Sequence, residues 1–360
     1  MKRMNVFVLL LSAFLVPIAC AQPQGPSPAG ASATSPIQSS EKVLVVIRDK
    51  SGMPIQGLTP EEITIIDNGN PTKTLSVEPA DKLPIRLGII LISNAATFKA
   101  QQETSLQLLA ALRPSIDQAF VLNNWTCSWV SAQACPDVKY GNTPTLAWNS
   151  DLQTQATAIR SLHWSTVTES ESGFANKMLG LDGDQLFRRI IIEFRDPGAE
   201  GLENSEFENR EQRTWTESME DRQVKEIATL QQVKTQAYIF AIEDPFVANT
   251  PLMQGGVDPA MNGQGARGLA QWDNDKKRAY KDGQVRLERL ASSTGGRFVL
   301  GVHGFKSGVS EFQKDLQSQY VLTFMPGVPD PNNTAHTIEV RTTRKDAKII
   351  VQKQFYPGVR

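Results

Sequence analysis

The pattern of apolar and polar positions divides the chain into three parts. Near its start and again near its end, short β-branched runs are separated by turn residues, which predicts strands. Between them, long apolar runs alternate with stretches whose apolar residues recur every three to four positions, which predicts strands alternating with helices. The strands expected in the two outer parts are 42–48, 63–66, 75–77, 320–324, 337–341 and 349–355.

The central part, 84–317, is predicted to be an α/β domain with a doubly wound, mostly parallel sheet. Its first run, Ile85–Ile92, is almost continuously apolar, as expected of a strand that helices cover on both faces. The expected strands are 85–92, 119–122, 145–148, 190–194, 237–242 and 297–300, and the expected helices are 101–112, 152–162, 217–233, 285–292 and 309–317.

The two outer parts, 41–83 and 318–360, are predicted to form one discontinuous all-β sandwich that flanks the central domain. Each part has too few strands to be stable alone, and the two ends of an inserted domain usually lie close together. Two separate small sheets packed on the α/β domain are the alternative.

Residues 1–21 are predicted to be a secretory signal peptide. A basic head precedes the mostly apolar run Val6–Ile18, which is short for a membrane span, and the small residues 19–21 fit a cleavage site. A retained anchor and lipidation at Cys20 are the alternatives. The Pro-, Ser- and Ala-rich stretch 22–40 is predicted to be a disordered linker. We therefore expect an exported protein, periplasmic or extracellular, with membrane contact only through the signal segment or a lipid on Cys20.

Two cysteines remain after cleavage, Cys127 and Cys135. An oxidising compartment favours a disulfide between them, and the short loop it closes would contribute about 2–3 kcal/mol of stability. Two free thiols are the alternative. Trp125 and Trp129 flank Cys127, so this loop is a candidate binding surface, unless the two aromatic side chains only cover the sheet edge.

Composition and motifs argue against several classes of function. Lys plus Arg total 37 and Asp plus Glu total 38, so the net charge of −1 does not fit a strongly basic nucleic-acid binder. The three histidines are far apart in the sequence, and no Gly-x-Ser-x-Gly elbow is present. The glycines of 263–268 imitate a dinucleotide loop but follow no strand, so an ordinary loop is expected there. We predict no enzyme activity and no cofactor, with a hydrolase as the remote alternative.

Short segments spread over residues 43–357 resemble one family in their order and spacing. The segments are Val45–Gly52 (VVIRDKSG), Gly57–Ile63 (GLTPEEI), Asp67–Pro71 (DNGNP), Pro84–Leu91 (PIRLGIIL), Ala291–Phe298 (ASSTGGRF), Ser318–Leu322 (SQYVL) and Phe355–Pro357 (FYP). They resemble the von Willebrand factor A-related proteins found mostly in acidobacteria. The resemblance implies an α/β domain that often carries a metal-ion-dependent adhesion site.

That site needs Asp-x-Ser-x-Ser after the first strand, with a Thr and an Asp from two further loops, as the resemblance implies. In this chain Ile92, Asn94 and Ala96 stand at the three first-loop positions, so two of the three side chains have no oxygen atom that could bind a cation. Asp196 matches the family's Asp, but Arg195 beside it brings a cation. Because hard cations need several oxygen ligands, we predict a degenerate site that holds no metal.

A rearranged metal site is the alternative, with Thr168 as the nearest match for the Thr and with Asp182 and Asp184 as further ligands. It would make the chain a metal-dependent adhesion protein. The favoured interpretation is an exported, non-catalytic protein-interaction module whose protein partner the sequence does not identify.

Overall fold

The computed structural model describes the greater part of the chain after residue 39. The described residues are 40–92, 94, 96–124, 139–140, 148–164, 166–167, 187–198, 210–242, 264–327, 335–351 and 354–355. All of them belong to one compact unit, Gln38–Arg360. The expected signal peptide and nearly all of the expected linker lie outside the described residues.

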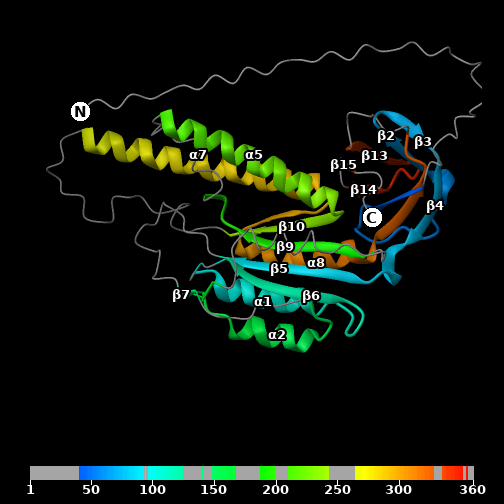
Figure 1. Cartoon of the computed structure of the whole chain (residues 1–360), viewed down its shortest axis with the longest axis horizontal. Coiled ribbons are helices and arrows are strands. Elements are labelled where there is room, and N and C mark those ends of the chain that lie inside the picture. Colours follow the sequence, from blue (N-terminus) through cyan, green and yellow to red (C-terminus); the bar gives the residue numbers. More distant parts are fainter. Residues whose placement is uncertain are drawn as a thin grey trace, which may run out of the picture. The chain divides into compact units, whose positions relative to one another are not determined.

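A five-stranded parallel sheet forms the centre of this unit (Figure 1). Its strand order is β11-β10-β9-β5-β6, and every neighbouring pair is parallel. The strands are β5 (Ile85–Ile92), β6 (Gln118–Asn124), β9 (Arg188–Arg195), β10 (Thr235–Ala241) and β11 (Phe298–Leu300). The predicted α/β class is therefore confirmed.

Helices cover both faces of this sheet, and each face has its own apolar core. One core packs the sheet against α1 (Phe98–Leu109), α2 (Leu152–Ser161) and α8 (Phe305–Gln317). The other packs it against α5 (Arg210–Gln232) and α7 (Gln264–Ser293), which run together above the sheet in Figure 1. Burial on both faces explains why the central strands are almost continuously apolar.

Two four-stranded antiparallel sheets combine strands from both ends of the unit. One has the order β14-β1-β12-β4, and the other has the order β15-β13-β2-β3. They consist of β1 (Glu41–Arg48), β2 (Ile63–Asp67), β3 (Asn70–Thr72), β4 (Thr74–Pro79), β12 (Gln319–Phe324), β13 (His336–Thr342), β14 (Lys348–Val351) and β15 (Gln354–Phe355). Apolar side chains of both sheets belong to one common core.

The β2–β3 connection and one buried pair show how the two ends are joined. Asn68 and Gly69 adopt positive φ angles of 49° and 81°, which is the geometry that the expected tight turn requires. His336 of β13 lies with its Nδ1 2.6 Å from Oδ1 of Asp67 in β2, and both side chains are almost fully buried. A β2 carboxylate therefore fixes a β13 side chain more than 260 positions away.

A buried charge network links the first antiparallel sheet to the α/β part. Asp315 of α8 is 1% exposed and accepts hydrogen bonds from the Arg297 guanidinium, with Nη2 2.8 Å from Oδ1. Arg48 of β1 places Nη1 3.3 Å from the same oxygen and donates from Nη2 to Glu311 at 2.7 Å. Burial raises the pKa of Tyr238, and Asp315 adds to this effect, so the phenol stays protonated and donates to Asp315 at 3.2 Å.

Glu311 extends the network to the more exposed side of α8. Burial alone would raise its pKa, but hydrogen bonds from Lys314 and Arg48 outweigh that effect and lower the pKa to about 2. Glu311 is therefore charged at neutral pH and helps to balance Arg48.

One expectation about the central part is wrong, and another is tested at a single residue. Helix α7 begins at Gln264, so Gly265 and Gly268 lie in a helix rather than in the expected loop. Of the expected strand 145–148, only Trp148 lies within the described residues, and the nearest pairing is an isolated antiparallel bridge between Ala119 and Asn149.

None of the helices that the structure describes is long and apolar enough to cross a membrane.

Asp315→Ala should lower the free energy of unfolding by about 3–5 kcal/mol, because it leaves the buried Arg48 guanidinium and the partly buried Arg297 guanidinium without their shared carboxylate. Urea unfolding of the purified chain measures this loss. Glu339→Ala is the matched control, since Glu339 pairs with Arg341 at the surface with 54% and 64% of the side chains exposed, and it should cost less than about 1 kcal/mol. Equal, small losses in both variants would contradict the role given to Asp315.

Candidate functional site

The structure brings the Ile92–Ala96 loop and Asp196 to the same edge of the parallel sheet. Ile92 ends β5, and Asp196 directly follows β9, the strand that pairs with β5. The chain passes from β5 to β6 on one side and returns to β9 on the other, so the strand order reverses between β5 and β9. Ligands of open α/β sheets bind at such a reversal, beyond the carboxyl ends of the strands.

Gln101 of α1 binds the backbone at the end of β5. Its side chain is fully buried, and its Oε1 accepts from the Ile92 backbone N–H at 2.9 Å. Its Nε2 donates to the Ile92 carbonyl oxygen at 3.2 Å and to Thr97 Oγ1 at 3.0 Å. The amide thus pairs both backbone groups of Ile92 just beyond the point where the β5–β9 ladder ends, at Ile90 and Glu193.

Asn94 directs its oxygen into its own loop. Oδ1 accepts from the Thr97 backbone N–H at 3.1 Å and from Thr97 Oγ1 at 3.2 Å, while the Asn94 N–H donates to the Ile92 carbonyl at 2.9 Å. The neutral oxygen that a cation could have used is therefore already committed to two donors.

The other two first-loop positions offer only carbon. Ile92 is 1% exposed and belongs to the apolar core that faces α1, α2 and α8, and Ala96 is exposed in the turn before α1. A divalent cation needs several oxygen ligands, so the described residues of this loop do not fit one.

Asp196 and Arg195 point to different partners. Asp196 is 6% exposed, and its Oδ1 accepts from the Gly198 N–H at 2.8 Å. Arg195 was expected to neutralise Asp196, but the structure places its guanidinium on Glu193 at 2.6 Å and on Glu226 of α5 at 2.5 Å. Arg195 and Glu193 are two positions apart on one strand, so they share a face of the sheet.

Helix α7 presses against the segment that follows Asp196. A Cβ built on Gly283 would lie 1.9 Å from the Pro197 carbonyl oxygen. Only glycine permits this approach, which accounts for a glycine inside a long helix despite its low helix propensity.

Several expected site residues lie outside the described residues. They are Cys127, Cys135, Trp125, Trp129, Thr168, Asp182 and Asp184. The predicted disulfide and the rearranged metal site therefore stay predictions. Within the described part of the chain, no group of three or more His, Cys, Asp or Glu side chains is placed to hold a metal ion.

Sequence analysis missed Gln101 and Thr97, which decide the chemistry of the loop. A signal was present, because Gln101 lies on the stripe of α1 that also carries Ser105 and Leu108, at helical spacing. A polar residue on a buried stripe needs a hydrogen-bond partner, and the nearest unpaired backbone groups belong to the preceding strand end.

Comparisons with known proteins identify no family for this chain and find only distant structural likenesses. No family model matches the chain, and no curated protein matches it. One similar solved structure is an aerotolerance-related membrane protein from Bacteroides fragilis, with 9% identity and a TM-score of 0.34 over 64% of this chain and 98% of that one. Another is proximal thread matrix protein 1 from the mussel byssus, with 10% identity and a TM-score of 0.34 over 67% of this chain and 49% of that one. Likenesses at this level carry no argument about fold or function.

Gln101→Leu should lower the free energy of unfolding by about 1–3 kcal/mol, because it leaves the buried N–H of Ile92 unpaired and removes one of the two donors to the Ile92 carbonyl. Gln107→Leu, on the exposed face of the same helix, should change it by less than about 0.5 kcal/mol. Chemical denaturation of both variants measures the difference. Losses of the same size would mean that the Gln101 amide does not hold the loop.

Proposed function

We propose that this chain is an exported, non-catalytic protein-interaction module. Its α/β part is a von Willebrand factor A-type domain with a metal-silent adhesion site, and the strands of both chain ends frame it as one discontinuous β-sandwich. The partner is another protein, bound without a bridging cation and without a cofactor.

The strand order supports the A-type assignment. An all-parallel sheet whose order reverses between β5 and β9, with helices on both faces, is the architecture that the sequence resemblance implies. The sandwich is supported by the mixed origin of both antiparallel sheets and by their common core, in which β1 and β2 side chains pack with those of β12 and β13.

The observation that carries the proposal is the closed loop after β5. The backbone groups of Ile92 bond to Gln101, and the side-chain oxygen of Asn94 bonds to Thr97, while the side chains of Ile92 and Ala96 present only carbon. A domain of this type that lacks oxygen ligands at these loop positions would keep the scaffold without the cation bridge, and it would bind its partner by direct surface contact.

Export is proposed from the charged head, short apolar run and cleavage site in 1–21. The same signal supports the Cys127–Cys135 disulfide, since two cysteines would remain in an oxidising compartment. In this proposal 22–40 is the linker and 84–317 is the α/β domain. The ranges 41–83 and 318–360 are the two parts of the sandwich.

Millimolar Mg²⁺, Mn²⁺ or Ca²⁺ should leave the melting temperature unchanged, and capture of the partner from exported fractions should be equal in Mg²⁺ and in EDTA. A bound ion at 100 times its dissociation constant would add about 2.7 kcal/mol, which a thermal melt detects easily. The control is Asp196→Ala, judged by the metal-dependent shift alone because losing the bond to Gly198 lowers baseline stability. A metal-induced rise that Asp196→Ala abolishes would overturn the proposal and favour metal-dependent adhesion.

A further inference from the structure

The tight turn between β2 and β3 contains an asparagine followed by a glycine. Asn68 and Gly69 form this turn between the paired residues Asp67 and Asn70, and both of them are exposed. In such a sequence the backbone nitrogen of the glycine can attack the side-chain carbonyl carbon of the asparagine, because no Cβ crowds the approach of that nitrogen. The reaction releases the side-chain amide nitrogen and needs neither a cofactor nor a second protein.

The amide group that would be attacked is held in place by the opposite end of the chain. Asn68 Oδ1 accepts a hydrogen bond from the Thr337 backbone N–H at 2.8 Å. The Asn68 N–H donates in turn to the Thr337 carbonyl oxygen at 2.9 Å. Attack on the amide carbon moves negative charge onto Oδ1, and a donor about 2.7–3.1 Å from such an oxygen stabilises that charge. The Thr337 N–H therefore favours the reaction at this amide.

The attacking group, the Gly69 backbone nitrogen, is not held in the same way. The β2–β3 ladder pairs Asp67 with Asn70 and leaves Gly69 outside it. Within the described part of the chain no backbone hydrogen bond is donated by the Gly69 N–H. A Cβ built on Gly69 would have no atom within 4 Å, so no neighbour resists rotation of this peptide group. A fixed amide is thus followed in the chain by a nitrogen that is free to rotate toward it.

The other described asparagines lack this combination. Asn70 is exposed in the same hairpin, but Pro71 follows it, and a proline nitrogen in a peptide carries no proton to give up. Asn94 Oδ1 accepts from Thr97 at two atoms, but alanine follows Asn94. Among the asparagines that the structure describes, Asn68 alone is followed by glycine.

We propose that Asn68 is a self-modification site whose isoaspartate product loosens the contact between β2 and β13. The Gly69 nitrogen bonds to Cγ of Asn68, and its proton leaves with the amide nitrogen as ammonia. Water then opens the five-membered imide that has formed. Opening at the side-chain carbonyl gives aspartate, and opening at the main-chain carbonyl gives isoaspartate, in which Cβ and Cγ belong to the main chain. This inference does not depend on the proposed function, because the reaction involves no partner.

Isoaspartate would act at the point where the two ends of the unit meet. Asn68 and Thr337 are 269 positions apart, and their bonds continue the β2–β13 ladder beyond its last pair, Asp67 with Ile338. A main chain lengthened by one carbon does not fit the paired positive-φ geometry of this two-residue turn. Aspartate, by contrast, keeps the main chain and keeps an acceptor oxygen for the Thr337 N–H.

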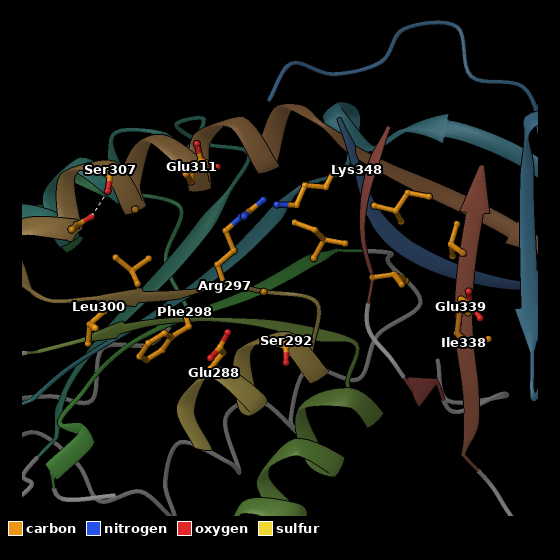
Figure 2. A pocket seen from close by; sticks show the side chains of 18 residues that line it. Glu288, Ser292, Arg297, Phe298, Leu300, Ser307, Glu311, Ile338, Glu339 and Lys348 are labelled. Carbon is orange, nitrogen blue, oxygen red and sulfur yellow. Dashed lines mark hydrogen bonds between the residues drawn. The ribbon is translucent and has the colours of Figure 1, made fainter. Parts of the chain in front are cut away.

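The same strand forms one wall of a pocket. Ile338 and Glu339 directly follow Thr337 on β13, and they line a cavity of about 840 Å³ together with β11 and β14 (Figure 2). The bonds between Asn68 and Thr337 help to hold β13 against β2 at this end. Their loss would therefore loosen a surface that extends beyond the turn itself.

The first test follows the reaction. One sample of the full purified chain is kept folded in mildly alkaline buffer, and a second is kept in guanidinium chloride at the same pH. Peptide mapping by mass spectrometry measures asparagine, aspartate and isoaspartate at each position. Position 68 should convert about two- to tenfold faster in the folded chain, the factor expected of one hydrogen bond to the reacting oxygen, while Asn70 stays unchanged. Conversion that is absent, or no faster in the folded chain, would overturn the inference.

Gly69→Asn tests the attacking group. Asparagine also tolerates positive φ, so the turn can keep its shape, but its Cβ crowds the backbone nitrogen. Conversion at position 68 should slow by more than about tenfold, because the placement of the attacking atom controls the rate of such a step. Circular dichroism checks that the variant is folded. An unchanged rate in the folded variant would mean that the Gly69 nitrogen does not attack, and it would also overturn the inference.

A final test measures the effect on the fold. Ion exchange separates the modified chains, because each product carries a carboxylate in place of a neutral amide. Asn68→Asp is the matched control, since it has the same added charge and an ordinary main chain, and it should melt with the unmodified protein. The isoaspartate fraction should melt about 1–4 °C lower than Asn68→Asp. Equal melting temperatures for the isoaspartate fraction and Asn68→Asp would contradict the loosening of β2 and β13 and overturn the inference.

Discussion

The carboxylate of Asp315 holds two arginines that reach it from different sheets of the fold. Arg48 comes from the first antiparallel strand, and Arg297 precedes the last parallel strand. A carboxylate that is 1% exposed stays charged in the fold only when such partners compensate the free energy of its desolvation. The same contacts join α8 to both sheets. We therefore expect the stability of the fold to depend on this buried group.

Much of the fold could be predicted because its signals are local. The apolar run Ile85–Ile92 matches β5 residue for residue, and Asp151 caps α2 by accepting from the N–H groups of Gln153 and Thr154. The first half of α7 could not be predicted, because its sequence is polar and glycine-containing and intrinsic propensity favoured a loop. Gly283 shows the same limit, since only its contact with Pro197, far away in the sequence, explains it.

The candidate site could be predicted only in part. The apolar side chains at Ile92 and Ala96 are visible in the sequence. The bonds from Gln101 to the Ile92 backbone depend on how α1 packs against the end of β5, which a pattern of residue types does not encode.

The most direct test of this account is native-state hydrogen exchange on the full chain, with β1 and β10 compared. If Asp315 ties the sheets into one cooperative unit, the slowest amides of both strands should exchange with the same opening free energy. Asp315→Asn should then lower both values by the same amount. Exchange of β1 through a separate opening of lower free energy, unchanged in Asp315→Asn, would contradict the account.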